Sequence, residues 1–166
     1  MVRFTKVKKV VNDEKFFTKA LIEGSSIELA RVKLDLRREK AGVLLLGTVN
    51  WRATFPSTAF DTGGWAEVTF ELLRDGAVIY RIHQSAVQGE NIGNLSSPPI
   101  QTVFRITTLR HFDTASVFGK PEKVRYALRA TNIIMIDPIG DTPVVVTAHI
   151  GAVTFTAQEI EASIPE

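Results

Sequence analysis

Apolar and polar side chains alternate with a period of two residues along most of this chain, which is the pattern of half-buried β-strands. The clearest case runs from Val43 to Phe55, where every second residue is apolar or glycine and most of the others are polar. Residues 28–37 alternate in the same way. Leu44 and Leu46 interrupt the polar face of the first segment, which indicates that this end of the strand is covered on both sides.

A hairpin is predicted where two alternating runs flank Asp75 and Gly76. Asp-Gly favours a tight type I′ turn, because both central residues of that turn need a positive φ. Further strands are expected over residues 101–108, 124–130, 133–136 and 144–157, the last of them either as one strand bent near Gly151 or as two short strands.

The segments between the expected strands are rich in turn-forming residues. A helical turn or two is expected over residues 13–22. Loops, turns and a polar tail are expected over residues 56–64, 84–99, 113–121, 137–141 and 158–166.

Eight or nine strands without an amphipathic helix between them predict antiparallel sheets rather than βαβ units. Because each strand has one apolar face, two sheets must pack face to face. The long connections favour a Greek-key path, so the predicted fold is an all-β, antiparallel two-sheet sandwich with jelly-roll topology. Residues 28–162 form the predicted sandwich, residues 1–27 an N-terminal arm or first strand, and residues 163–166 a tail.

Composition removes several classes of protein. The 166 residues are 45% hydrophobic and include no cysteine, which excludes disulfides and cysteine-bound zinc. No apolar segment has the length of a membrane span or of a secretory leader. We therefore expect no membrane span.

Positive charge is concentrated at the start of the chain. Residues 1–40 hold 11 Lys or Arg against 6 Asp or Glu, a net of +5, whereas the remainder has a net charge of −3. A basic segment of this kind can bind a nucleic acid, an anionic lipid or the acidic body of another copy. No nucleic-acid motif accompanies it, so we expect no nucleic acid as partner.

Residues 2–11 mix β-branched residues with lysines and precede the regular pattern. They are predicted either to add to the sheet edge of a neighbouring copy, or to form the first strand of their own domain. The side chains assigned to self-assembly under the first alternative are Arg3, Phe4, Val7 and Val10.

Reactive side chains do not form a recognisable motif. The three histidines, His83, His111 and His149, lack metal-ligand spacing. Glu67 and Glu71 share one strand face, where a solvated surface is expected rather than a glycosidase pair. No catalytic residue, metal or cofactor is predicted, and we expect that the protein is not an enzyme. An enzyme of the cupin type is disfavoured, because it would need clustered histidines and these three are scattered along the sequence.

The two tryptophans differ in their expected burial. Trp51 lies on the apolar face of its strand and is expected in the core. Trp65 lies beside a polar loop, and an exposed tryptophan there can stack on a sugar ring.

Three segments resemble small jelly-roll proteins of spore-forming Gram-positive bacteria. They are VLLLGTVNWRA at residues 43–53, VTFELLRDGAVIY at 68–80 and VTFTAQEI at 153–160, within a likeness that spans residues 41–162. These C1q/TNF-like proteins occur on spore surfaces and in spore appendages. The resemblance implies assembly into trimers, layers or fibres, here without cysteine cross-links. It also implies a location on a cell or spore surface or outside the cell, and a cytoplasmic location stays open.

The sequence thus favours a structural subunit that assembles non-covalently with copies of itself into a fibre or layer, with other surface-layer proteins as further candidate partners. One alternative is a carbohydrate- or cell-surface-binding module that uses the loops at residues 55–65 and 84–99. A second alternative is a viral or phage coat component.

Overall fold

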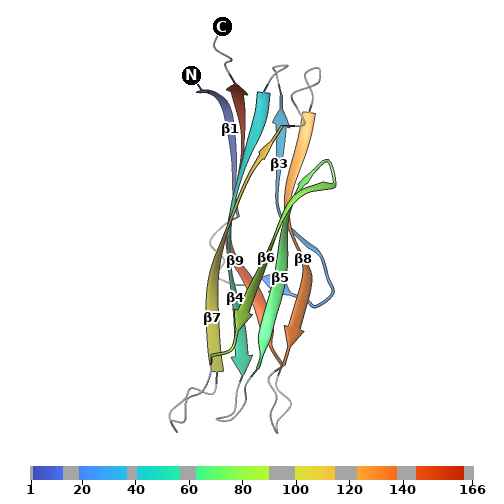
Figure 1. The fold of residues 1–166 in the computed structure, drawn as a ribbon, viewed down its shortest axis with the longest axis vertical. Helices are drawn as coiled ribbons and strands as arrows, with labels where there is room; N and C mark the ends of the chain where they lie inside the picture. The colour runs from blue at the N-terminus through green and yellow to red at the C-terminus, as the bar shows by residue number, and fades with distance from the viewer. Residues whose placement is uncertain are drawn as a thin grey trace.

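A computed structural model describes residues 2–12, 19–36, 41–56, 63–89, 100–114, 123–137 and 145–162. These residues form an elongated sandwich of two antiparallel sheets (Figure 1). The strands are β1 (Val2–Asn12), β2 (Lys19–Leu21), β3 (Ile27–Asp35), β4 (Ala41–Pro56), β5 (Trp65–Arg74), β6 (Ala77–Val87), β7 (Ile100–Asp113), β8 (Lys123–Ile136) and β9 (Thr147–Ala162).

The strand order is that of a jelly roll. The first sheet has the order β1-β9-β4-β7, with β2 also paired to β9, and the second sheet has the order β3-β8-β5-β6. The pairs β5·β6, β4·β7, β3·β8 and β1·β9 are nested, as if one long hairpin had been wound into a sandwich. The predicted two-sheet sandwich with jelly-roll topology is therefore confirmed.

The hairpin at Asp75 and Gly76 confirms the turn predicted from sequence. Both residues have positive φ values, 47° and 92°. Asp75 also exchanges backbone contacts with a third strand: its N–H donates to the Arg125 carbonyl, and its carboxylate accepts from the Arg125 N–H. The turn is thus fixed to β8 as well as closing β5 onto β6.

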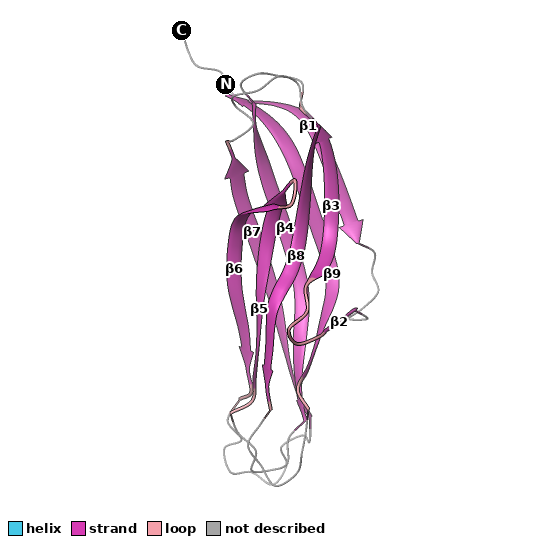
Figure 2. Cartoon of the chain, turned by 90° about the vertical axis from the view of Figure 1, so that its right-hand side faces the viewer, coloured by secondary structure: helices cyan, strands magenta, loops and turns pink. Residues whose placement is uncertain are grey.

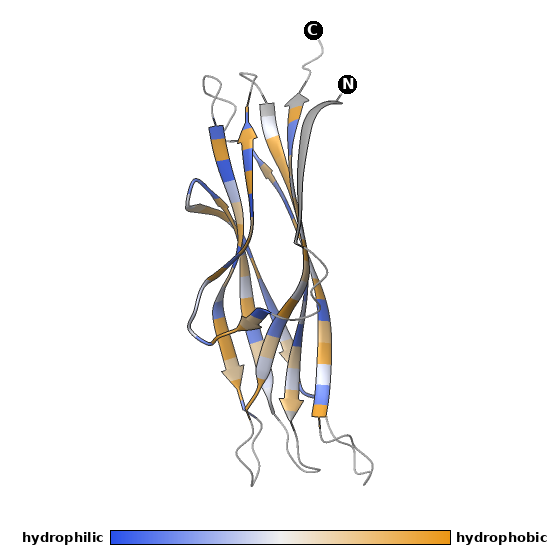
Figure 3. Ribbon diagram, turned by 180° about the vertical axis from the view of Figure 1, so that it is seen from behind, coloured by the Kyte–Doolittle hydropathy of each residue, from blue (hydrophilic) through white to orange (hydrophobic). Residues whose placement is uncertain are grey.

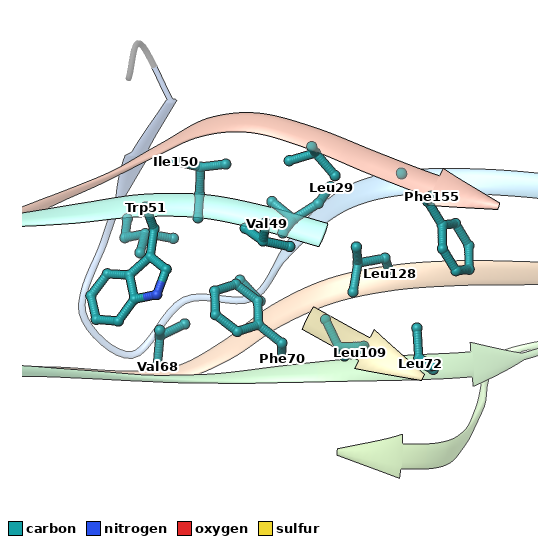
Figure 4. Close-up of a cluster of buried hydrophobic side chains, with 14 of the residues drawn as sticks. Leu29, Val49, Trp51, Val68, Phe70, Leu72, Leu109, Leu128, Ile150 and Phe155 are labelled. Atoms are coloured by element: carbon teal, nitrogen blue, oxygen red, sulfur yellow. The ribbon is translucent and has the colours of Figure 1, made fainter. Parts of the chain in front are cut away.

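The core lies between the sheets, and both sheets contribute to it (Figure 4). Trp51 of β4 is fully buried, as predicted, and its ring meets Phe70 of β5 edge-on with centroids 6.5 Å apart. The indole N–H donates to Thr107 Oγ1 at 3.3 Å, so burial leaves this polar group satisfied. Alternating hydropathy along the strands is visible in Figure 3.

Two of the register shifts between paired strands fall in segments whose course was predicted from the sequence. In β8 the register with β5 shifts between Glu67 and Thr69, opposite Asn132, whose φ is 46°. Residues 133–136, predicted as a separate strand, therefore continue β8 across this bulge. The bend predicted near Gly151 is confirmed, because the register of β9 with β4 shifts between Val49 and Trp51, opposite Gly151.

The N-terminal segment forms strands on one edge of the first sheet (Figure 2). Residues 2–12 pair along β9 of the same chain, which is the second of the two alternatives that the sequence left open. The helical turn expected over residues 13–22 is wrong at Lys19–Leu21, where the chain forms β2 and buries Leu21. Residues 13–18 lie outside the described residues.

Several strands extend further than the alternation indicated. β9 continues through residues 158–162, which lie within the predicted sandwich although their polar composition is typical of a tail, because Glu159 and its neighbours pair with β4. β6 runs to Val87 and β7 to Asp113, into segments predicted as a loop and a turn. Polar side chains at these strand ends concealed the continuing backbone pairing.

Candidate interaction surfaces

The outer faces of the two sheets differ in chemistry. The outer positions of β4, β7 and β9 carry mostly threonines and large apolar side chains. Alternation and register place there Leu44, Leu46, Thr48, Asn50, Arg52 and Thr54 of β4, Thr102, Phe104, Ile106, Thr108, Arg110 and Phe112 of β7, and His149, Thr154, Thr156 and Gln158 of β9.

Large apolar side chains on this face are open to solvent. Ile106 is 72% exposed and Phe104 is 58% exposed, and Leu46 and Phe112 are also exposed. The Phe112 ring lies against Gly42, where a Cβ atom would come within 2.2 Å of the ring. We call this band across β4, β7 and β9 the apolar face.

Side chains close the corner between β6 and β7. The Arg105 guanidinium donates to the Ser85 carbonyl at 3.2 Å. The Gln101 amide accepts from the Gly89 N–H at 2.9 Å and donates to its carbonyl at 3.4 Å, in the manner of a paired strand. Backbone groups at a sheet edge that are already hydrogen-bonded in this way are less available to pair with a strand from another molecule.

The outer face of the second sheet is charged. Glu71, expected in a solvated surface, is instead buried because arginines on both flanking strands cover it. Arg129 donates to its carboxylate through Nε at 3.0 Å and Nη2 at 2.5 Å, and Arg81 Nη2 lies 3.6 Å away. Glu67, two residues earlier on β5, is exposed. The expectation of a solvated surface is therefore wrong for Glu71 and holds for Glu67.

A groove of about 410 Å³ lies on the same outer face, beside the β8 bulge. It is lined by Glu67, Val68, Thr69, His83, Gln84, Ser85, Asn132 and Ile134. His83 Nδ1 lies 2.8 Å from Thr69 Oγ1, so a neighbouring strand holds the imidazole ring.

Trp65 lies next to the groove, in the row of cross-strand partners adjacent to the row of Glu67. It pairs with Val87 on β6 and with Ile136 on β8, whereas Glu67 pairs with Ser85 and Ile134 in the adjacent row. Trp65 is 39% exposed, and both of its cross-strand partners are exposed too.

The remaining histidines lie apart from this groove. His111 stacks on Tyr80 with ring centroids 5.4 Å apart. Burial, with a smaller contribution from Arg52, lowers the pKa of His149. Within the described ranges, no three His, Asp or Glu side chains gather in a way that could hold a metal ion.

The backbone places the four residues assigned to self-assembly along the β1–β9 ladder. Arg3 pairs with Glu161 and Phe4 with Ile160, at the start of β1. Further along the ladder, Val7 pairs with Gln158 and Val10 with Phe155.

No family model matches the chain, and no curated protein matches it. Among solved structures, it is similar to the infectious bursal disease virus VP2 subviral particle (13% identity, TM-score 0.41, 95% of this chain and 37% of that one). It is also similar to dimeric latent PorU from Porphyromonas gingivalis (13% identity, TM-score 0.38, 92% of this chain and 12% of that one). The chain thus spans well under half of each protein. At such TM-scores, the description of the fold rests on the strand order given above.

No helix suited to crossing a membrane occurs in the part of the chain that the structure describes.

Proposed function

We propose that the protein is a structural subunit that associates non-covalently with copies of itself through the apolar face. The observation that carries this proposal is the difference between the two outer faces. The cores of protein interfaces are depleted of charged residues and enriched in aromatic ones. The apolar face fits that description more closely: Phe104, Ile106 and Phe112 lie there among threonines, and its charged members are Arg52 and Arg110. The opposite face also exposes apolar side chains around Trp65, but β5, β6 and β8 contribute more glutamates and arginines to it.

The size of the apolar face supports a second copy as its occupant. Three adjacent strands are about 14 Å wide, and fourteen residues of strand are about 46 Å long. The resulting footprint of about 650 Å² approaches the ~800 Å² that each partner contributes to a standard interface. Threonine hydroxyls cost less to desolvate than charges, and Thr54 and Thr102 already approach each other at 3.5 Å.

The N-terminal strand supplies a second mode of assembly within this proposal. A β1 strand from a neighbouring copy would make the same backbone hydrogen bonds to β9 that it makes within its own chain. Arg3, Phe4, Val7 and Val10 would then join two subunits. If β1 exchanges, removal of residues 1–12 leaves a folded, soluble monomer, whereas an unfolded or insoluble product contradicts exchange.

A fibre, a surface layer or a coat is the kind of assembly we propose, with copies of the same chain as the principal partner. The resemblance to spore-surface jelly rolls favours a location on a cell or spore surface. Negative-stain microscopy of the purified protein distinguishes fibres, layers and closed particles.

Sedimentation velocity of matched lysine variants tests the proposal. Ile106→Lys places a charge in the apolar face, and Val87→Lys places the same charge at an exposed aliphatic position on the opposite sheet. We expect full assembly by the wild type and by Val87→Lys, and markedly smaller species from Ile106→Lys, which lacks association through the apolar face. A monomeric wild type, or equal assembly by both variants, would overturn the proposal.

A further inference from the structure

We propose that the groove beside the β8 bulge, together with the exposed Trp65 row, binds a neutral oligosaccharide. The site lies on the second sheet, away from the apolar face, so the inference is independent of the proposed self-association. Two features carry it: an exposed apolar platform, and a set of hydrogen-bonding groups one row away.

The platform is built by strand register. Trp65 is flanked by Val87 and Ile136, and all three are exposed. The two outer strands of this row lie about 10 Å apart, centre to centre, so the row accommodates more than one sugar ring. Sugars with equatorial substituents present flat faces of C–H groups, which stack on an indole ring.

The adjoining groove supplies partners for hydroxyl groups. Ser85 and the Asn132 amide can both donate and accept, and Glu67 accepts. Thr69 holds the His83 ring through Nδ1, which leaves Nε2 as the ring atom for a ligand. A hydroxyl group also donates and accepts, so a chain of vicinal hydroxyls matches this set. The volume of about 410 Å³ lies within the range of small-ligand sites.

The charge of the groove argues for a neutral ligand. Among the described residues that line it, none is Lys or Arg, and Glu67 is the one carboxylate. The nearby Arg81 and Arg129 are engaged with the buried Glu71. An acidic sugar would therefore meet a carboxylate without a compensating cation in the lining.

The β8 bulge gives the site a specific residue to test. Asn132 has a left-handed backbone, φ 46°, which glycine adopts without strain. Asn132→Gly therefore removes the amide and tolerates the bend. Trp65→Ala removes the platform, and Phe104→Ala is the matched control, an exposed aromatic residue on the opposite face.

The experiment is a calorimetric titration of the full chain with cellotetraose, chitotetraose and the acidic tetragalacturonate. We expect binding of a neutral tetrasaccharide, a loss of about tenfold or more in Trp65→Ala, and a loss of about threefold to tenfold in Asn132→Gly. Phe104→Ala should bind as the wild type does. Unchanged far-ultraviolet circular dichroism must show that each variant is folded.

Three results would overturn the proposal. They are no binding of either neutral sugar at millimolar concentration, a preference for tetragalacturonate, and affinity that survives Trp65→Ala. Equal losses in Trp65→Ala and Phe104→Ala would count against it as well, because the control lies on the other sheet.

Discussion

The Asp113 carboxylate joins the two sheets through buried hydrogen bonds, and its removal should be costly. Asp113 of β7 accepts from the Tyr126 hydroxyl of β8 at 2.8 Å and from Arg74 Nη1 of β5 at 3.3 Å. Tyr126 is fully buried and Asp113 nearly so. Because the donors and the acceptor come from opposite sheets, this cluster stabilises the sandwich at the hairpin end.

Asp113→Ala should lower the free energy of unfolding by about 3–5 kcal/mol, since a buried hydroxyl and a guanidinium both lose the carboxylate. Tyr126→Phe should cost about 1.5–3 kcal/mol, the usual contribution of a hydrogen bond to a charged group. The double variant should cost less than the sum by about 1–3 kcal/mol, because Tyr126→Phe removes the hydroxyl that Asp113→Ala leaves unsatisfied.

Urea unfolding followed by tryptophan fluorescence measures these free energies, since Trp51 is buried in the native state. The control is Glu28→Ala, which breaks an ion pair with Arg31 of similar length, 2.7 Å, between exposed side chains. That change should cost less than about 1 kcal/mol. Additive losses in the Asp113 and Tyr126 variants, or losses no larger than the control, would refute the reasoning.

Three further predictions concern single positions. Burial, assisted by the hydrogen bond to Asp113, raises the pKa of Tyr126, so its contribution to stability is complete below pH 10 and falls as pH rises further. Above pH 10, the free energy of unfolding should therefore fall more steeply with pH in the wild type than in Tyr126→Phe. The difference in slope should reach up to ~1.4 kcal/mol per pH unit, and urea titrations at alkaline pH measure it. Gly42→Ala should cost about 1 kcal/mol because its methyl group displaces the Phe112 ring, whereas Gly47→Ala, with its nearest neighbours at 3.5 Å, should not destabilise. In the same assay, Glu71→Gln should lower the free energy of unfolding by about 1–3 kcal/mol, and Glu67→Gln by less than ~0.5 kcal/mol. Equal effects of the two substitutions would show that the burial of Glu71 is unimportant for stability.

The sequence predicted the strands and the core well because alternation reports which side chains face inward. The inward set of β4, the burial of Trp51 and the turn at Asp75 and Gly76 are all confirmed. Strand ends were harder to predict. Residues 158–162 read as a polar tail, although backbone hydrogen bonds to β4 do not depend on apolar side chains.

The candidate surfaces depend on neighbours that are distant in sequence. Glu71 is buried by Arg129, which lies 58 residues away, and alternation within β5 cannot reveal that contact. The Trp65 row likewise needs the register of three strands. Leu44 and Leu46 interrupt the polar alternation and so indicated an unusual outer face. The prediction that this end of the strand is covered on both sides is wrong within the described chain, because Leu46 is 38% exposed.

The accessibility of single thiols, with and without assembly, tests the central claim that the apolar face is the self-association surface. The chain has no cysteine, so Ile106→Cys and Val87→Cys each introduce one unique thiol on opposite outer faces. Self-association through the apolar face predicts that alkylation at position 106 slows markedly as protein concentration rises, while alkylation at position 87 does not change. Equal alkylation rates at position 106 in dilute and concentrated protein would contradict it.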